Sequence, residues 1–391
     1  MSKNLWCDVL VVGAGLVGAS LVCALRNSGL RIAVMEARPP AAAAQAWDAR
    51  VYALSPASQK FLQQLGVWEK LDPGRIEAVR EMRIFGDDGV ASLEFSAYQS
   101  AVDRLATIVE AGAVQRALWE ALRGARDIEL LFPETAREIL WGRDGCDIHL
   151  EGGGTITTKL LVGADGMHSA VRAAAGIEAR IEPAGQQGVV ANFSCSLPHL
   201  GAAFQWFRED GVLAWLPLPG RRFSMVWSTD EAHAAQLLQC GDAALCEQVA
   251  QAGRGTLGEL GLLTPPAAFP LAWLSVRNRV RERLALIGDA GHVVHPLAGQ
   301  GVNLGFGDAR ELAALLRDAA QRRADPGELL RLRKFERSRA EAILAMRLAT
   351  KGLKGLFGDR SVAMTTMRNF GLNLIDRATV IKNLLARHAM D

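Results

Sequence analysis

The sequence predicts an α/β fold: a parallel sheet of the dinucleotide-binding kind, an inserted antiparallel sheet and a helical C-terminal segment. Three observations predict it. A strand, a glycine-rich turn, a helix and a second strand open the chain; short strands with tight turns occupy residues 187–228; helical periodicity recurs between residues 303 and 389. A chain of 391 residues that is 50% hydrophobic and 22% charged excludes an intrinsically disordered protein and suits two or three domains, at roughly 150 residues each.

The first elements form one βαβ unit. We expect a buried strand at Val9–Val12, a helix from Leu16 to Asn27 that Gly29 ends, and a second strand at Arg31–Glu36. Two strands joined in this way lie parallel in one sheet. The uncharged run Val9–Leu25 has the length of a targeting segment, but the three glycines inside it favour the βαβ unit.

A Gly-x-Gly-x-x-Gly pattern lies between this strand and helix. Gly13 makes the tight turn, Gly15 lets the backbone approach a pyrophosphate, and Gly18 allows close packing of helix on strand. Glu36 ends the next strand, where a carboxylate can accept hydrogen bonds from a ribose diol. The pattern recurs at Gly253–Gly258, but there it follows a predicted helix, so we expect one dinucleotide-binding fold and not two.

The middle of the chain alternates helices and short strands. We expect helices at Ser55–Leu65 and Ala113–Arg123, strands at Arg83–Phe85 and Ser92–Phe95, and a meander of strands between Ile128 and Thr158. Four antiparallel strands and a helical region should follow, at Gln187–Ser196, Ala203–Arg208, Gly211–Pro217, Phe223–Ser228 and Glu231–Ala252.

A second motif follows a short buried strand at Leu160–Gly163. The strand leads into Asp165-Gly166, and a helix opens near Ser169. The alternative interpretation of this stretch is an ordinary strand–turn–helix with Ser169 as its cap.

A third motif follows the buried strand Leu284–Ile287. Gly288-Asp289 and a loop with a proline and several glycines lead into a helix that runs from Asn303 to about Ala319. Such a loop offers backbone N–H groups and a helix dipole to a flat ring that becomes anionic on reduction, and Asp289 suits a polyol hydroxyl. His292 and His295 lack a further ligand at matching spacing, so we predict no metal site.

The cysteines indicate the redox compartment of the protein, and the charge distribution indicates a basic C-terminal segment. Six cysteines without a CxxC pair are typical of a reducing compartment. From Arg331 to Asp391, where helices are expected at Arg331–Ala349 and Thr379–Ala389, 13 lysines and arginines face 5 acidic residues, a local charge of +8 in a chain of net charge +2. This basic segment suits either an anionic partner surface or a solvated helical face.

The three motifs, in this order and at these separations, resemble the FAD-dependent single-component aromatic monooxygenases typified by para-hydroxybenzoate hydroxylase. Asp48–Ser55, Gly288–Gly305 and stretches of the tail such as Phe335-Glu336-Arg337 and Arg368–Leu372 are similar to the ubiquinone-biosynthesis hydroxylase family. The resemblance spans about residues 5–390. The sequence departs from the family pattern after Glu110, at Lys351 and at Gly307, where the family often has arginine.

The resemblance implies a set of cofactor contacts. Gly13, Gly15 and Gly18 would bind the FAD pyrophosphate and Glu36 the adenosine ribose. Arg50 would reach the pyrophosphate with Gln115 nearby, Asp165 would lie by the pyrophosphate and the nicotinamide path, and Arg172 would steady that loop. Asp289 would bind the ribitol, and the isoalloxazine would be wrapped by Pro296, Gly299, Gln300, Gly301, Val302 and Asn303.

The resemblance also implies the chemistry. NAD(P)H would reduce the flavin, and a flavin C4a-hydroperoxide would transfer oxygen to the ring of a ubiquinone precursor. His295 and Pro296 are the candidate catalytic residues beside the flavin; His295 could hydrogen-bond a phenol or serve only the loop's structure. The alternatives are a flavin-dependent reductase or dehydrogenase on the same fold and a non-catalytic, FAD-holding member of a biosynthetic complex.

The implied architecture divides the chain into three parts. The FAD-binding domain would comprise residues 1–78, 106–180 and 276–330; the substrate domain, residues 79–105 and 181–275; and the basic helical segment, residues 331–391. Substrate would lie between flavin and the antiparallel sheet. The apolar residues that could line it, each of which could instead pack in the core, are Phe204, Trp206, Trp215, Leu216, Leu218 and Trp227.

The expected partners are small molecules: a prenylated phenol as substrate and no nucleic acid. We expect a cytoplasmic enzyme whose Arg331–Asp391 segment contacts the inner-membrane surface, a biosynthetic complex or only its own core. The sequence leaves open a homo-oligomer, the ring position that is hydroxylated and the choice between NADH and NADPH.

Overall fold

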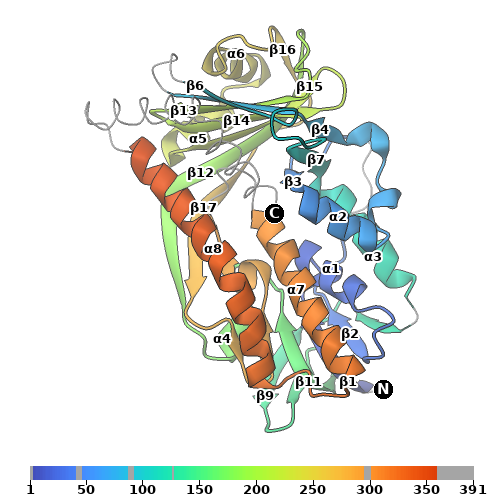
Figure 1. The fold of residues 1–391 in the computed structure, drawn as a ribbon. Coiled ribbons are helices and arrows are strands. Elements are labelled where there is room, and N and C mark those ends of the chain that lie inside the picture. The colour runs from blue at the N-terminus through green and yellow to red at the C-terminus, as the bar shows by residue number, and fades with distance from the viewer. Residues whose placement is uncertain (1–2, 41–45, 87–91, 126, 295–300, 359–391) are drawn as a thin grey trace.

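Two large sheets lie at opposite ends of the molecule, and two long strands connect these ends. The computed structural model describes residues 3–40, 46–86, 92–125, 127–294 and 301–358. Within these ranges, a mainly parallel sheet lies at one end of the molecule and a mainly antiparallel sheet at the other, and helices α7 (Gly301–Gln321) and α8 (Leu329–Gly358) run beside one another along the side (Figure 1).

The parallel sheet has the strand order β18-β19-β11-β1-β2-β8. β2 and the second halves of β1 and β11 are apolar and largely buried, because protein covers both of their faces. The bounds are Lys3–Val12 for β1, Ile32–Met35 for β2, Ile128–Leu131 for β8, Gly154–Gly163 for β11, Val280–Arg281 for β18 and Leu284–Leu286 for β19. β9 (Ala136–Trp141) and β10 (Cys146–Leu150) extend β11 as a meander.

Three expectations for this region need correction. The first strand begins at Lys3 because its first half pairs with β11 from Gly154 onward. The first helix, α1, spans Leu16–Ala24 and ends before Asn27, which adopts a left-handed φ of 57°. Ile128–Leu131 does not belong to the meander, since it pairs in parallel with β2.

Helices pack against one face of the parallel sheet and bury a large apolar core. α1, α2 (Pro56–Gln64), α3 (Ala111–Arg123) and α7 contribute to it, and α1 meets α7 closely. A Cβ atom on Gly305 of α7 would lie 2.4 Å from a methyl group of Val17. The short strands β3 (Val51–Leu54), β7 (Ala106–Glu110) and β4 (Glu77–Val79) form a small sheet beside these helices, next to the turns η1 (Trp68–Lys70) and η2 (Pro73–Arg75).

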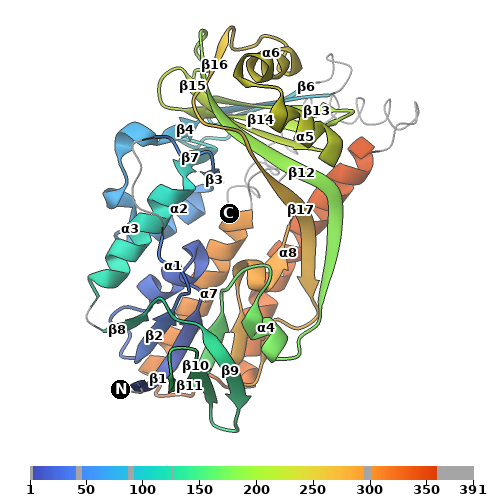
Figure 2. The same ribbon diagram turned by 180° about the vertical axis from the view of Figure 1, so that it is seen from behind.

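The second large sheet has the order β20-β17-β12-β15-β14-β13-β5-β6, with β16 paired to β12. Its strands are β5 (Glu81–Phe85), β6 (Ser92–Ser96), β12 (Ala179–Cys195), β13 (Ala202–Arg208), β14 (Gly211–Leu218), β15 (Arg222–Thr229), β16 (Leu260–Leu262), β17 (Ala267–Val276) and β20 (His292–Val293). Helices α5 (Glu231–Gln239) and α6 (Asp242–Ala252) cover its outer face (Figure 2).

Two strands connect the two ends of the molecule. β12 runs for 17 residues, and it pairs with β17 along most of its length, with an irregularity between Pro183 and Gln187. Figure 2 shows this pair spanning the distance from the outer sheet to the region of α4 (Ala170–Ala174). Strands expected only at Gln187–Ser196 therefore extend back to Ala179.

The C-terminal helix α8 begins at Leu329, two residues before the expected start, and continues to Gly358. The helix expected at Thr379–Ala389 lies outside the described residues. Within the described ranges, no helix combines the length and the apolar character needed to cross a bilayer. The domain boundaries inferred from the sequence stay a prediction.

Candidate active site

The turn Gly13–Gly18 lies at the carboxyl edge of the parallel sheet. Gly13 has φ +99°, and a Cβ atom there would lie 2.4 Å from the carbonyl oxygen of Ala164. A Cβ atom on Gly18 would lie 1.9 Å from the carbonyl oxygen of Gly13. Gly15 differs, since its Cβ would meet no atom of the described residues within 4 Å. Two glycines thus permit close backbone packing and the third borders open space.

Three side chains fix the peptide groups of this turn at Ala14. The Ala14 N–H donates to Glu36 Oε2 at 2.7 Å, and its carbonyl accepts from Gln115 Nε2 at 2.7 Å and Trp119 Nε1 at 2.8 Å. Glu36 and Gln115 were expected to contact the cofactor itself; here both are bonded to the turn that would hold it. Trp119 was missed, because a buried tryptophan on a helix carries no motif.

Arg50 and Asp289 come together across the site although 239 positions separate them in the chain. Arg50 interacts with both Asp289 and the hydroxyl of Tyr52. Asp289 is exposed, but the protein around its carboxyl group displaces enough water to raise the pKa of this group above the ordinary value, although His292 and Arg50 act to lower it. Burial likewise raises the pKa of Tyr52, against the effect of Arg50.

Arg172 joins the second motif to the third. Its guanidinium is buried and donates to the carbonyl oxygens of Met167 at 2.8 Å and Ala290 at 3.0 Å. Ser169 caps α4 by accepting from the Arg172 N–H, and Asp165 supports this first turn by accepting from Ser169 Oγ at 2.6 Å and from the Val171 N–H at 3.1 Å. The expectation that Arg172 steadies this loop is confirmed, and the partner loop is the one that carries Asp289.

Asn303, at the start of α7, ties that helix to the end of β3. Its Oδ1 accepts from the Ser55 N–H at 3.0 Å, and its Nδ2 donates to the Ala53 carbonyl at 2.9 Å. Val302 is buried in the apolar core, and a Cβ on Gly301 would meet none of the described atoms within 4 Å. His295, Pro296, Gly299 and Gln300 lie outside the described residues, so their predicted roles stay predictions.

The aromatic residues expected to line a substrate site lie on the wrong face of the outer sheet. Phe204, Trp206, Trp215 and Trp227 are buried against α5 and α6, away from the parallel sheet. Gly253, the first glycine of the second Gly-x-Gly-x-x-Gly pattern, follows α6 and leaves room for Trp215, whose ring would lie 2.0 Å from a Cβ there. Leu216 and Leu218 pack instead toward β3 and β7.

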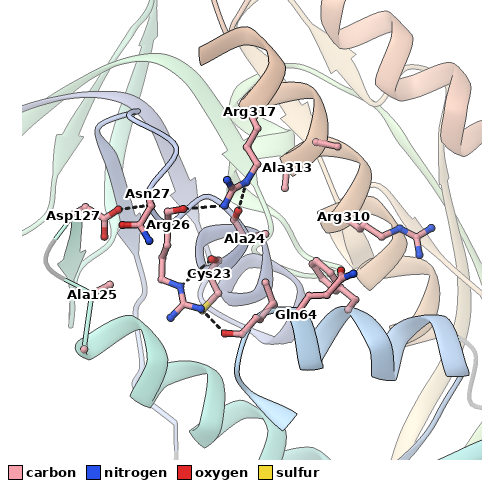
Figure 3. A pocket seen from close by; sticks show the side chains of 14 residues that line it. Cys23, Ala24, Arg26, Asn27, Gln64, Ala125, Asp127, Arg310, Ala313 and Arg317 are labelled. Atoms are coloured by element: carbon pink, nitrogen blue, oxygen red, sulfur yellow. Dashed lines mark hydrogen bonds between the residues drawn. The ribbon is translucent and has the colours of Figure 1, made fainter. Parts of the chain in front are cut away.

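A hollow of about 740 Å³ lies at the other end of α1, between α2, α3 and α7 (Figure 3). Two of the arginines that line it bind carbonyls at or just past helix ends: Arg26 donates to Cys23 and Leu65, and Arg317 donates to Ala24 and to the Arg26 carbonyl. Positive charge at helix C-termini stabilises the fold. This hollow is therefore separate from the edge where the three motifs meet.

That edge fits an FAD molecule. The N-terminus of α1 has no side-chain cap, its N-cap residue Gly15 borders open space, and a helix N-terminus favours a pyrophosphate. The carboxyl ends of β1, β2, β11 and β19 bring the glycine turn, Glu36, Asp165 and Asp289 to one side of the sheet. Among the described residues, no group of three or more His, Cys, Asp or Glu side chains is arranged to hold a metal ion.

Comparisons with known proteins agree with this geometry. The FAD binding domain family model matches residues 6–346. Ubiquinone hydroxylase UbiL of Rhodospirillum rubrum is 32% identical over 98% of this chain and 89% of its own length. The 3-demethoxyubiquinol 3-hydroxylase of Escherichia coli is 32% identical over 98% of each chain, and human mitochondrial ubiquinone biosynthesis monooxygenase COQ6 is 32% identical over 98% of this chain and 92% of its own.

Solved structures share the fold. p-Nitrophenol 4-monooxygenase PnpA of Pseudomonas putida superposes with a TM-score of 0.80 at 18% identity, covering 99% of this chain and 97% of its own. PqsL of Pseudomonas aeruginosa, a probable FAD-dependent monooxygenase, gives 0.76 at 23% identity, covering 94% and 99%. FAD is the cofactor, and NAD(P)H is the co-substrate typical of the family. The chain therefore belongs to the ubiquinone-biosynthesis hydroxylases, FAD-dependent monooxygenases of the para-hydroxybenzoate hydroxylase-like fold.

Proposed function

We propose that the chain hydroxylates the aromatic ring of a ubiquinone precursor, a prenylated phenol. In this reaction a ring C–H becomes C–OH with one atom of dioxygen, the other atom leaves as water, and NAD(P)H supplies two electrons. The observation that carries the proposal is the match, over nearly the whole chain, to a ubiquinone hydroxylase and to a 3-demethoxyubiquinol 3-hydroxylase.

The proposed cofactor site uses the residues gathered at the carboxyl edge of the parallel sheet. The pyrophosphate would lie at Gly15 and the N-terminus of α1, with Arg50 neutralising its charge and Asp289 on the ribitol. Glu36 already holds the Ala14 N–H through one oxygen and the Arg38 N–H through the other, so a ribose diol would share these oxygens as a further donor. Bound FAD would supply the electron transfer between NAD(P)H and dioxygen.

We propose that the substrate ring lies against the inner face of the outer sheet. Strand register places Val190, Val226 and Ala214 in one row there, and these side chains are buried or half-buried. In the next row, Asn192 Oδ1 and Ser224 Oγ are buried without a hydrogen-bond partner among the described residues. Buried polar groups of this kind are rare unless they have a ligand or a water to bind.

Asn192 connects this row to the cofactor segment. Its Nδ2 donates at 2.8 Å to the carbonyl of Asp48, two residues before Arg50. A phenol hydroxyl near Asn192 would therefore lie close to the proposed flavin position, in surroundings that exclude water. His295 and Pro296 stay the candidates for contact with the reacting ring.

A variant separates this substrate site from the cofactor site. Val226→Trp should fill the space in front of the sheet and abolish product formation, while the FAD content of the purified protein stays at the wild-type level. Val212→Trp is the matched control, because Val212 lies on the same face but at the beginning of β14, opposite Ser228. Full activity of the Val226 variant would place the substrate elsewhere.

The reaction itself is tested by supplying purified holoprotein with a prenylated phenol, NAD(P)H and dioxygen. The expected product is heavier by one oxygen atom, with little peroxide. NAD(P)H oxidation without this product would support a reductase or dehydrogenase, and no substrate-stimulated oxidation would support a non-catalytic protein. Mass spectrometry of lipid extracts from a deletion strain names the step, because the accumulated precursor is the substrate.

We also propose that α8 and the basic segment Arg331–Asp391 bring the enzyme to an anionic membrane surface, where a prenylated substrate resides. On α8, Leu344 and Leu348 are 54% and 63% exposed, and Lys334 and Arg337 are exposed on the preceding turns. A helix face with exposed leucines beside basic residues suits the interface of a bilayer. Residues 331–391 would form the segment that follows the FAD-binding and substrate domains.

A further inference from the structure

One buried carboxylate holds both ends of the turn that carries Asp289. Asp308 of α7 is fully buried, and its Oδ2 accepts from the Gly288 N–H at 3.0 Å and from His292 Nε2 at 2.6 Å. Gly288 is the first residue of the turn η3 (Gly288–Ala290), His292 follows the turn, and the exposed residue of the turn is Asp289. Asp308 therefore fixes this loop at its two ends and leaves the Asp289 carboxylate, which lies between them beside Arg50, exposed toward a ligand.

The other oxygen of the same carboxylate is held from α8. Asp308 Oδ1 accepts from Arg339 Nε at 2.8 Å, and Arg339 Nη2 donates to the Leu304 carbonyl at 3.1 Å. Arg339 reaches this position because residue 307 is glycine: a Cβ there would lie 2.5 Å from Arg339 Nη2. Gly307, where the family often has arginine, thus makes room for an arginine from another helix.

The surroundings of Asp308 are strongly positive. Burial alone would raise the pKa of its carboxyl group, but His292, Arg339 and the nearby Arg279 outweigh burial and hold the pKa below its ordinary value. Glu336 binds Arg279 through its side chain and its carbonyl, so it offsets part of this charge. Because its pKa is lowered, the Asp308 carboxylate is charged near neutral pH and can accept all three hydrogen bonds.

We propose that Asp308 is a positioning residue for FAD: with His292 and Arg339 it forms a clamp, defined by these three residues, that presents Asp289 to the cofactor. The inference rests on the assignment of Asp289 to the FAD site and is independent of the identity of the substrate. It makes α8 a part of the cofactor site although no residue of α8 is assigned to the cofactor itself.

The test is FAD titration of the apoprotein, followed by flavin fluorescence, together with urea unfolding of the same apoprotein. Asp308→Asn replaces an acceptor with a group that must turn a donor toward Arg339 or toward His292. We expect the Kd for FAD to rise on the order of tenfold or more, because a buried donor loses its partner. Arg339→Met should behave similarly, and Arg339→Lys should recover part of the affinity because it keeps the charge.

Gly307→Ala separates the clamp from general stability. Alanine favours a helix over glycine, so helix propensity alone predicts a more stable protein. The added methyl group would instead displace Arg339, and the clamp predicts weaker FAD binding from an apoprotein that is still folded. Glu341→Gln, at an exposed charged side chain on the same helix, is the matched control and should leave the Kd unchanged.

The two outcomes are distinct. If the clamp positions Asp289, Asp308→Asn and Arg339→Met weaken FAD binding, the double variant is no weaker than the worse single variant, and Gly307→Ala follows them. A Kd within twofold of wild type in the Asp308 and Gly307 variants, with a lower urea midpoint only, would overturn the proposal and leave the network as packing between α7 and α8.

Discussion

A single methyl group at Gly15 would point into the space where we expect the pyrophosphate. Gly15→Ala should therefore leave the apoprotein folded but reduce its FAD content to about a tenth of wild type or less. The added methyl group would block the approach of the FAD pyrophosphate to the protein backbone at residue 15. Gly352→Ala is the control, since a Cβ at that exposed helical glycine also meets no described atom within 4 Å. Flavin absorbance per chain is the measurement, and equal FAD content in both variants would contradict the site.

At Asp289, the carboxylate expected to bind FAD is expected to lower the stability of the folded apoprotein. The surrounding protein raises the pKa of the Asp289 carboxyl group in the folded state, so ionisation of this group lowers the stability of the fold. The loss is absent below the ordinary pKa and grows as pH rises through the folded pKa. Asp289→Asn should therefore make the apoprotein more stable than wild type near neutral pH, and the difference should vanish below the ordinary value of 3.8.

The same substitution should weaken FAD binding, because the amide lacks the carboxylate's acceptor strength toward a polyol. Urea midpoints of the apoproteins between pH 3 and 8, with FAD titrations at neutral pH, measure the two effects. If the wild-type apoprotein is the more stable of the two at neutral pH, ionisation of Asp289 does not lower the stability of the fold, and the prediction is wrong.

At the scale of elements, α6 and β14 show why a sequence pattern can mislead. Gly253–Gly258 repeats the spacing of the cofactor turn, yet Gly253 serves to seat the Trp215 ring. Gly253→Ala should destabilise the outer sheet by roughly 1–3 kcal/mol through overpacking. FAD content should stay at the wild-type level, measured beside urea unfolding. Loss of FAD from a folded Gly253→Ala protein would favour a second cofactor contact there.

The βαβ unit and the three motifs could be predicted because their chemistry is local: a glycine turn, an acidic residue at a strand end, a Gly-Asp turn. The sequence could not predict which face of the outer sheet holds the aromatic core. Trp206 lies between Gln205 and Phe207, and Trp215 lies between Ala214 and Leu216, so large apolar side chains occur on both faces of these strands. Only α5 and α6 determine which face holds the aromatic core. The parallel pairing of β5 with β13, about 120 positions apart, likewise leaves no local signal.

The same limit applies to the site. Glu36, Gln115 and Asp289 are recognisable from motifs, but Trp119, Asn192 and Asp308 act through partners far along the chain. A tryptophan or asparagine within an amphipathic element looks like any other until the fold brings Ala14 or Asp48 beside it. Residues that position a site are thus harder to predict than residues that form it.

At the scale of the whole molecule, the outer face of α8 should bind anionic bilayers. Liposome flotation at low salt should recover more protein with vesicles containing an anionic lipid than with neutral ones, since each basic residue near the surface contributes about 1 kcal/mol, screened by salt. Lys334→Glu with Arg337→Glu should reduce flotation, as should Leu344→Ser with Leu348→Ser. Equal recovery from both kinds of vesicle would contradict the membrane proposal.

Arg339 and the leucines of this outer face are carried by the same rigid helix, a few turns apart. If both roles hold, cofactor loading and surface docking are thermodynamically linked, and the linkage is reciprocal: whatever factor FAD adds to bilayer affinity, the bilayer adds to FAD affinity. An apoprotein would then be released from the surface more readily than a loaded one. A cell short of flavin would keep fewer idle copies at the site where the substrate resides.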